Sequence, residues 1–238
     1  MIIHLLSSPR NVSTALMYAF AQRADTKVMD EPFYGYYLCK HGVGHPGKAE
    51  IINAMECTFD GIIRQINELQ SRHSHVFIKN MAHHLIETPL DFLRSYKNIL
   101  FIRHPKEIIT SFAKVIPAPT MQDIGVQQQS VLFDELNRSC VHAPLVIDSA
   151  ELIKNPEALL KKLCESLEIP FSKQMLSWET GGIPEDGIWA KYWYENVHNS
   201  TGFQTPRKKE EPLPPHCTVL LEEALPFYHA LSRHTIKI

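Results

Sequence analysis

The sequence lacks the cysteine pattern of a disulfide-rich or zinc-binding protein. Its five cysteines, Cys39, Cys57, Cys140, Cys164 and Cys217, are an odd number, are widely spaced and form no CxxC pair. Neither a disulfide framework nor a structural zinc site is therefore expected. This usage of cysteine is typical of a protein from a reducing compartment.

Charge of one sign and long apolar runs are also missing. A net charge of -2 and a pI near 6.7 give no general attraction to nucleic acid or to an acidic membrane, so neither is expected as a partner. No apolar run approaches the ~18 residues that would cross a bilayer, and no basic segment precedes the first apolar stretch, as it would in a signal peptide. We expect a soluble, cytoplasmic protein.

The chain is large enough for one well-packed domain. With 238 residues and 44% apolar content, folding can bury roughly 70 to 75% of the unfolded surface. No internal repeat or low-complexity segment divides the sequence. We expect one domain over residues 1–238.

The first twenty residues predict a strand, a polar loop and a helix. Ile2 to Leu6 is a short apolar run, and apolar residues recur at helical spacing from Leu16. Ser13 or Thr14 can cap the helix, whose free N–H groups and dipole favour an anion. The loop contains Arg10 but neither glycine nor lysine, so it is a poor match to the loop that binds Mg-ATP or Mg-GTP.

Further candidate residues follow predicted strands. Residues 26–30 form a strand that ends in Glu31-Pro32-Phe33, and the proline keeps Glu31 out of helical geometry. Residues 75–78 form a strand that delivers Lys79. In open α/β sheets, ligands bind at the carboxyl ends of the strands. Glu31 and Lys79 are therefore expected at the same edge as Arg10.

A second basic side chain also follows a strand. Residues 98–102 are apolar and end in Arg103, and a helix begins at Pro105 and carries Ser111. Two arginines, each between a strand and a helix, predict a ligand with two separated anionic groups.

Residues 34–48, which follow the second predicted strand, mix tyrosines, glycines and histidines and are interpreted as a mobile loop. Of these, His41 and His45 are expected to be exposed rather than to bind a metal.

The remaining pattern alternates helices and strands. Single helices are predicted over residues 49–70 and 121–139, a strand over 145–147, a helix from Pro156 and a last helix over 218–231. Strands that alternate with helices indicate an α/β fold of three layers, a mostly parallel sheet flanked by helices on both faces.

Residues 178–214 have a different composition. They hold all three tryptophans, Trp178, Trp189 and Trp193, and the basic run Arg207-Lys208-Lys209. A long segment of this kind in a compact domain is either a lid over a ligand or a secondary aromatic core, and the sequence favours neither.

Three segments at fitting intervals resemble the sulfotransferases that use 3'-phosphoadenosine 5'-phosphosulfate (PAPS). The stretch SSPRNVSTAL is similar to the family's 5'-phosphosulfate loop, often PKSGTTW, and FIRHPKEIITSF to its 3'-phosphate motif. The stretch DSAELIKNPEALLKKLCESLEIPF is similar to the passage that follows in the family. The resemblance covers roughly residues 1–170 and implies a P-loop NTPase-like fold, with PAP as the product.

The resemblance also implies roles for individual residues. Arg10 and Lys79 would act on the sulfuryl group, and Glu31 would be the general base, with His83 as second choice. The residues implied in donor binding are Arg10, Asn11, Val12, Ser13, Thr14, Arg103 and Ser111, and His83 and Phe33 would contact the acceptor. No metal is expected, because a sulfuryl group carries less charge than a terminal phosphoryl group and cationic side chains could neutralise the leaving phosphate.

Some family features are absent. The lysine strand continues Lys79-Asn80-Met81 instead of KTH, Val12 replaces a glycine, and Ala15 replaces a tryptophan that stacks on adenine in some members. The residues that could replace the adenine contacts are Trp189, Trp193, Lys191 and Arg207. The sequence is interpreted as a PAPS-dependent transferase acting on a hydroxyl or amine of a small molecule. The alternatives are a P-loop kinase for a small substrate and a non-catalytic nucleotide-binding protein of the same fold.

Overall fold

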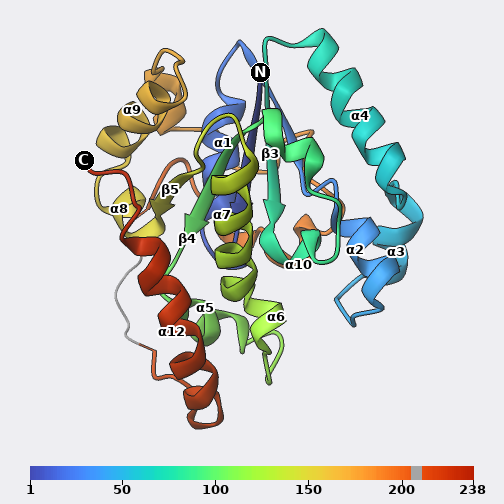
Figure 1. Cartoon of the computed structure of the whole chain (residues 1–238), viewed down its shortest axis with the longest axis vertical. Helices are drawn as coiled ribbons and strands as arrows, with labels where there is room; N and C mark the ends of the chain where they lie inside the picture. Colours follow the sequence, from blue (N-terminus) through green and yellow to red (C-terminus); the bar gives the residue numbers. More distant parts are fainter. Residues whose placement is uncertain (205–210) are drawn as a thin grey trace.

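The computed structural model describes residues 1–204 and 211–238. Five strands form one sheet in the order β2-β3-β1-β4-β5, and every pairing between them is parallel (Figure 1). The strands are β1 (Ile2–Ser7), β2 (Thr26–Asp30), β3 (His75–Met81), β4 (Lys97–Ile102) and β5 (Leu145–Asp148). The predicted mostly parallel sheet is confirmed.

The two faces of the sheet pack against different helices. Along β1, Ile3 and Leu5 belong to one core cluster, whereas Ile2 and Leu6 belong to the other, as the alternation of side chains along a strand requires. The first face is covered by α1 (Ser13–Ala21), α2 (Tyr34–His41), α3 (Lys48–Ala54), α8 (Ser149–Lys154) and α9 (Pro156–Ser166). The second face is covered by α4 (Phe59–Arg72), α7 (Val126–Ser139), α12 (Thr218–Ser232) and the 3-10 turns η1 (Ala82–Leu85) and η2 (Asp91–Ser95).

A smaller apolar cluster joins the C-terminal helix to the helix after β4. It contains Ile108 and Ile109 of α5 (Pro105–Phe112), and Ala224 of α12. Also in this cluster are α6 (Met121–Ile124) and the turn η4 (Pro215–Cys217). Figure 1 shows α5 beside α12, with α6 next to α5. As predicted, α5 begins with Pro105, where a missing N–H leaves no helical bond unmade.

Two predicted helices are each divided in the structure. Residues 49–70 form α3 and α4, because Thr58 ends the linker and caps α4 by accepting a hydrogen bond from Gly61 N at 3.2 Å. Residues 121–139 form α6 and α7, which meet at Gly125, where φ is 66°. Glycine adopts this left-handed conformation without steric cost. Both predictions of a single helix were wrong.

The interpretation of residues 34–48 as a mobile loop was also wrong. Residues 34–41 form α2, with Tyr34, Tyr37 and Leu38 buried against the core. Their spacing of three and four residues is that of one helix face. A connection without helix or strand remains only over residues 42–47.

The tryptophan-rich segment crosses the first face of the sheet. It follows η3 (Lys173–Leu176) and contains α10 (Ala190–Trp193) and α11 (Glu195–His198). Trp178 and Trp189 are buried in the main core cluster. Arg207 and the rest of the basic run lie outside the described residues. Within residues 1–204 and 211–238, no helix is both long and apolar enough to cross a membrane.

Candidate active site

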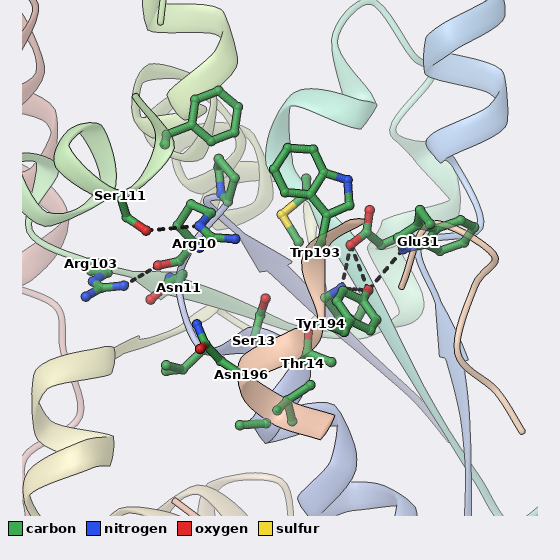
Figure 2. Close-up of a pocket in the computed structure, with 18 of the residues that line it drawn as sticks. Arg10, Asn11, Ser13, Thr14, Glu31, Arg103, Ser111, Trp193, Tyr194 and Asn196 are labelled. Atoms are coloured by element: carbon green, nitrogen blue, oxygen red, sulfur yellow. Dashed lines mark hydrogen bonds and ion pairs between the residues drawn. The ribbon is translucent and has the colours of Figure 1, made fainter. Parts of the chain in front are cut away.

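A cavity of about 700 Å³ lies at the carboxyl ends of the central strands (Figure 2). It is bounded by the loop after β1, the ends of β3 and β4, α2, and the segment around α10 and α11. All the residues predicted for catalysis, for the phosphate groups of the donor and for the acceptor line it, except Phe33. The volume is that of a typical small-molecule or cofactor site.

The loop after β1 has a strained backbone. Arg10 has a φ of 56° and Val12 a φ of 43°, a left-handed conformation that is rare for a β-branched residue. Strain of this kind gathers at ligand-binding sites. Val12 itself precedes the first turn of α1, and no side chain caps this helix, so the expected cap by Ser13 or Thr14 was wrong.

Asn11 fixes the loop to the neighbouring strand. Its side-chain nitrogen donates a hydrogen bond to the carbonyl of Phe101, while its Oδ1, although buried, has no partner among the described residues. Buried polar atoms without a partner are rare in folded proteins. Asn11 also lines the cavity, so a ligand hydroxyl or amide could satisfy this oxygen.

The two predicted anion-binding arginines form one continuous basic wall. Arg10 Nε donates to Ser111 Oγ at 3.0 Å, and Arg103 donates to the carbonyl of Arg10. Arg103 also contacts Glu107 Oε2 at 2.8 Å. The pKa of Arg10 is lowered by burial and, to a smaller extent, by the charge of Arg103. Among the described residues, Glu107 is the one carboxylate paired with either guanidinium group, and this excess of positive charge favours binding of an anion.

Gln129 on α7, which was not predicted from the sequence, binds the strands that precede the two arginines. Its side-chain nitrogen donates to the carbonyl of Leu6 at 3.1 Å and to that of Phe101 at 2.8 Å. The side chain is 1% exposed. Because Leu6 is on β1 and Phe101 on β4, Gln129 links the strands that lead into the two arginine segments.

At the opposite end of the cavity, Lys79 is buried among acidic groups. Its Nζ donates to Asp30 Oδ1 at 3.0 Å, to Glu31 and to the Tyr194 hydroxyl at 2.6 Å. Tyr194 Oη also accepts a hydrogen bond from Trp189 Nε1 at 3.0 Å. Asp30 and Tyr194 were not predicted as site residues. An ammonium group has three N–H donors, so these three acceptors account for all of them.

This cluster perturbs the acidity of its members. Burial raises the pKa of Glu31, which the Lys79 charge opposes and the Asp30 charge reinforces. Burial favours a lower pKa of Lys79, but the two carboxylates outweigh it, and the net change is upward. Burial and the Asp30 charge raise the pKa of Tyr194. Two carboxylates share one cation, so Glu31 is a stronger proton acceptor than an ordinary glutamate.

The backbone presents Glu31 to the cavity. Its φ is 42°, and its N–H donates to the Lys79 carbonyl at 2.7 Å, which extends the contact between β2 and β3 by one residue. The left-handed turn follows the last residue of β2. The predicted position of Glu31 at a strand end, outside helical geometry, agrees with the structure.

Histidines form the wall beside Glu31. His84 Nδ1 is 3.9 Å from Glu31 Oε2, and its ring stacks on Tyr34 with centroids 4.7 Å apart. Burial, and then the charge of His45, lower the pKa of His83 to about 3; burial likewise lowers that of His84. Nδ1 of neither ring has a partner among the described residues. His45 was expected to be exposed, but it is half-buried and lines the cavity.

Phe33 does not line the cavity, where its predicted contact with the acceptor would place it. Its ring is fully buried on the second face of the sheet, where it stacks on Phe92 with centroids 5.3 Å apart. The next residue, Tyr34, lines the cavity instead. The apolar character of Phe33 thus serves the core.

The residues suggested for an adenine contact divide into three groups. Trp189 and Trp193 line the cavity, and Trp193 is parallel to Phe112, with centroids 6.2 Å apart. Lys191 pairs with Glu50 at 2.6 Å on the surface and is not part of the lining. Arg207 lies outside the described residues.

Known proteins with similar sequences or folds point to one family. A family model described as a sulfotransferase domain matches residues 1–235. Two Arabidopsis thaliana proteins, branched-chain-amino-acid aminotransferase-like protein 2 and protein 1, are 39% and 38% identical over 234 residues, which is 98% of this chain. The chain spans only 42% of the length of these relatives, so their names are not carried over to it.

Two solved structures share the fold at low identity. The sulfotransferase domain from the curacin biosynthetic pathway has a TM-score of 0.55 and 18% identity, over 94% of this chain and 97% of that chain. The sulfotransferase domain from the Synechococcus PCC 7002 olefin synthase has a TM-score of 0.56 and 16% identity, over 95% and 94%. The chain belongs to the sulfotransferase domain family and has the P-loop-like α/β fold of that family.

Proposed function

We propose that the chain transfers a sulfuryl group from PAPS to a hydroxyl or amine of a small-molecule acceptor. The observation that carries this proposal is the polarity of the cavity: Arg10 and Arg103 lie at one end, and the buried carboxylate of Glu31 at the other. Moving an anionic group to a nucleophile requires a cationic site for the leaving group and an acceptor for the proton of the nucleophile.

The basic end is assigned to the donor. PAPS supplies a sulfuryl group that is activated by its bond to a phosphate. Arg10 and the backbone N–H groups of residues 12–14 would hold the 5'-phosphate, and Arg103 and Ser111 the 3'-phosphate. Ser111 Oγ accepts a hydrogen bond from Arg10, so its own hydroxyl hydrogen remains available for a phosphate oxygen. Asn11 Oδ1, which has no partner among the described residues, would accept a hydrogen bond from a hydroxyl or amino group of the donor.

Arg10 has the position suited to charge stabilisation during transfer. It follows β1, precedes α1 and is partly buried, which strengthens its interaction with an anion. As the bond to sulfur breaks, negative charge grows on the leaving phosphate. A guanidinium that is already in place stabilises this charge without further reorganisation.

Glu31 is the proposed general base. Its pKa is raised by burial, which makes it a better proton acceptor while Lys79 keeps it in place. His83 is a poor base, because burial lowers its pKa to about 3. Since all three donors of Lys79 are used by Asp30, Glu31 and Tyr194, we assign Lys79 to positioning Glu31 rather than to direct contact with the sulfuryl group.

Ligand-dependent thermal unfolding tests the donor assignment. At a hundredfold over its dissociation constant, PAP should add about 2.7 kcal/mol to the free energy of unfolding, which raises the midpoint of a chain of this length by roughly 5 to 10 °C. The shift should be unchanged by EDTA and lost in Arg103→Ala. The control variant Arg138→Ala removes an arginine whose side chain is 73% exposed, and this variant should retain the shift.

Other outcomes separate the rival functions. A larger shift with Mg-ATP than with PAP would contradict the donor assignment and favour a P-loop kinase. Transfer of ³⁵S from labelled PAPS to a panel of phenols, alcohols and amines then tests catalysis. Binding of PAP without transfer to any acceptor, and without an effect of Glu31→Gln, would favour a non-catalytic nucleotide-binding protein.

A further inference from the structure

Two cysteines face each other across a contact that plays no part in the proposed reaction. Cys39 is exposed in the last turn of α2, and Cys57 is half-buried in the linker between α3 and α4. Both are free thiols. They are separated by 17 residues of sequence and form no CxxC motif, so the sequence alone did not indicate the pair.

Gly35 shows how closely the linker approaches α2. A Cβ atom at Gly35 would lie 3.3 Å from Cys57 Sγ and 2.8 Å from Met55 Cβ. Cys39 is four residues further along α2, on the same helix face as Gly35. Side chains of a helix lean toward its N-terminus, so the Cys39 thiol is directed toward the turn that contacts Cys57.

The acidity of Cys57 reports the same proximity. Its pKa is raised to about 11, first by burial and then by the neighbouring Cys39 thiol. Cys57 therefore remains a protonated thiol at neutral pH. The exposed Cys39 is the accessible member of the pair, and reactivity of a thiol follows its accessibility and its thiolate fraction.

We propose that Cys39 and Cys57 form a reversible intramolecular disulfide when the protein meets a hydroperoxide. The Cys39 thiolate attacks one peroxide oxygen, the O–O bond breaks, and with hydrogen peroxide a sulfenic acid and one water are formed. Cys57 then attacks the sulfenic sulfur, loses its proton and releases a second water. Two thiols lose two electrons and two protons, and the peroxide is reduced to two waters.

The disulfide connects oxidation to the wall of the cavity. Tyr34, which lines the cavity, is on α2 five residues before Cys39. A bond from Cys39 to Cys57 would tether the C-terminal turn of this helix to the linker that precedes α4. A thiol reductant would release the tether, since the exposed Cys39 sulfur is open to exchange.

Peptide mapping tests the proposal directly and requires no activity. Trypsin separates Cys39, in residues 28–40, from Cys57, in residues 49–64. After limited treatment with hydrogen peroxide, we expect one cross-linked peptide pair that has lost two hydrogen atoms and disappears with dithiothreitol. The bond should be absent from C39S and C57S and should form undiminished in C140S, which alters a half-buried cysteine elsewhere.

The C57S variant also tests the proposal when hydrogen peroxide oxidises only a fraction of the protein. In C57S, the sulfenic acid at Cys39 should persist and be trapped by dimedone, whereas in the unaltered chain it should be consumed. Persistent dimedone labelling of Cys39 in the unaltered chain, a disulfide between two chains through Cys39, or a cross-link to Cys140, Cys164 or Cys217 would each overturn the proposal.

Discussion

The two ends of the cavity handle charge in opposite ways. At the basic end of the cavity, which we assign to the donor, Arg103 pairs with the Glu107 carboxylate, whereas Arg10 donates to the Ser111 hydroxyl. At the opposite end, which holds Glu31 and which we call the acceptor end, Lys79 pairs with two carboxylates, Asp30 and Glu31. Among the described residues, the donor end thus carries two cations against one carboxylate, whereas the acceptor end carries one cation against two carboxylates.

The difference assigns different work to the two ends. In the proposed reaction, the donor end would bind an anion, and the strained loop would hold Arg10 and the backbone N–H groups in place beforehand. The acceptor end holds a proton acceptor at a raised pKa, beside imidazoles that burial keeps neutral. A variant at either end should thus affect a different quantity: anion affinity at the first, and stability and pH dependence at the second.

Removing Lys79 should have the largest effect. Lys79→Met leaves Asp30 and Glu31 buried without a counterion, which costs about 3 to 5 kcal/mol and lowers the unfolding midpoint by about 6 to 20 °C at neutral pH. The matched control is Lys27→Met, because Lys27 forms an ion pair with Glu185 while its side chain is 40% exposed. Such exposed pairs contribute only about 0 to 1 kcal/mol.

A compensated variant sharpens the same test. Neutralising both carboxylates together with the lysine, as Lys79→Met with Asp30→Asn and Glu31→Gln, should recover much of the lost midpoint. If Lys79→Met lowered the midpoint no more than Lys27→Met, the Lys79 charge would not be what stabilises the two buried carboxylates. The contrast between the two ends would then be lost.

At the donor end, the corresponding structural weakness is Gln129. Gln129→Leu removes hydrogen bonds to the carbonyls of Leu6 and Phe101, each worth about 0.5 to 1.5 kcal/mol, while the Phe101 carbonyl keeps the hydrogen bond from Asn11. We expect denaturant unfolding to show a loss of about 1 to 3 kcal/mol, with weaker PAP binding measured by calorimetry. Gln127→Leu, at an exposed position of α7, should change neither. Equal losses in both variants would contradict the role of Gln129.

The contrast between the ends also shows what sequence could predict. Strand ends follow from local apolar runs: residues 26–30 were predicted as a strand, and β2 has those bounds. Once the strands are placed, parallel pairing brings their carboxyl ends together, so Arg10, Arg103, Lys79 and Glu31 could be predicted to meet. Donor-end residues were found because they occur in short motifs with fixed spacing.

The partners at the acceptor end could not be found in this way. Tyr194 and Lys79 are separated by 115 positions, and no spacing rule links them. Asp30 did have a signal, since two adjacent acids at a strand end opposite one lysine imply a shared cation. Helix α2 was not predicted, because the composition of residues 34–48 suggested a loop, although Tyr34 and Tyr37 have helical spacing. Phe33 was misplaced because a turn at Glu31 decides which face of the sheet it joins.

Tyr194 gives a smaller effect that appears in the pH profile. Its hydrogen bond lowers the pKa of Glu31 against the effect of burial, so Tyr194→Phe should raise that pKa further. A base acts when deprotonated, and the acid limb of the transfer rate should therefore move to higher pH. Tyr192→Phe, at a side chain that is 42% exposed, should leave the limb in place.

The measurement separates positioning from general damage. Transfer of ³⁵S followed from acid to alkaline pH should show Tyr194→Phe approaching the rate of the unaltered chain on the alkaline side. A rate lowered by the same factor at every pH would instead mean that Tyr194 acts only through packing.

The smallest effect should come from the strained loop at the donor end. Val12 has a φ of 43° and Glu168, far from the cavity lining, a φ of 61°. Glycine relieves about 1 kcal/mol of left-handed strain at either position, so Glu168→Gly should raise the unfolding midpoint by about 2 to 4 °C. Val12→Gly should raise it less, because the half-buried Val12 side chain packs against the core. Only Val12→Gly should weaken PAP binding, by about two- to fivefold, because a looser loop must be ordered on binding. Tighter PAP binding by Val12→Gly would mean that the strain opposes the anion instead of preparing its site.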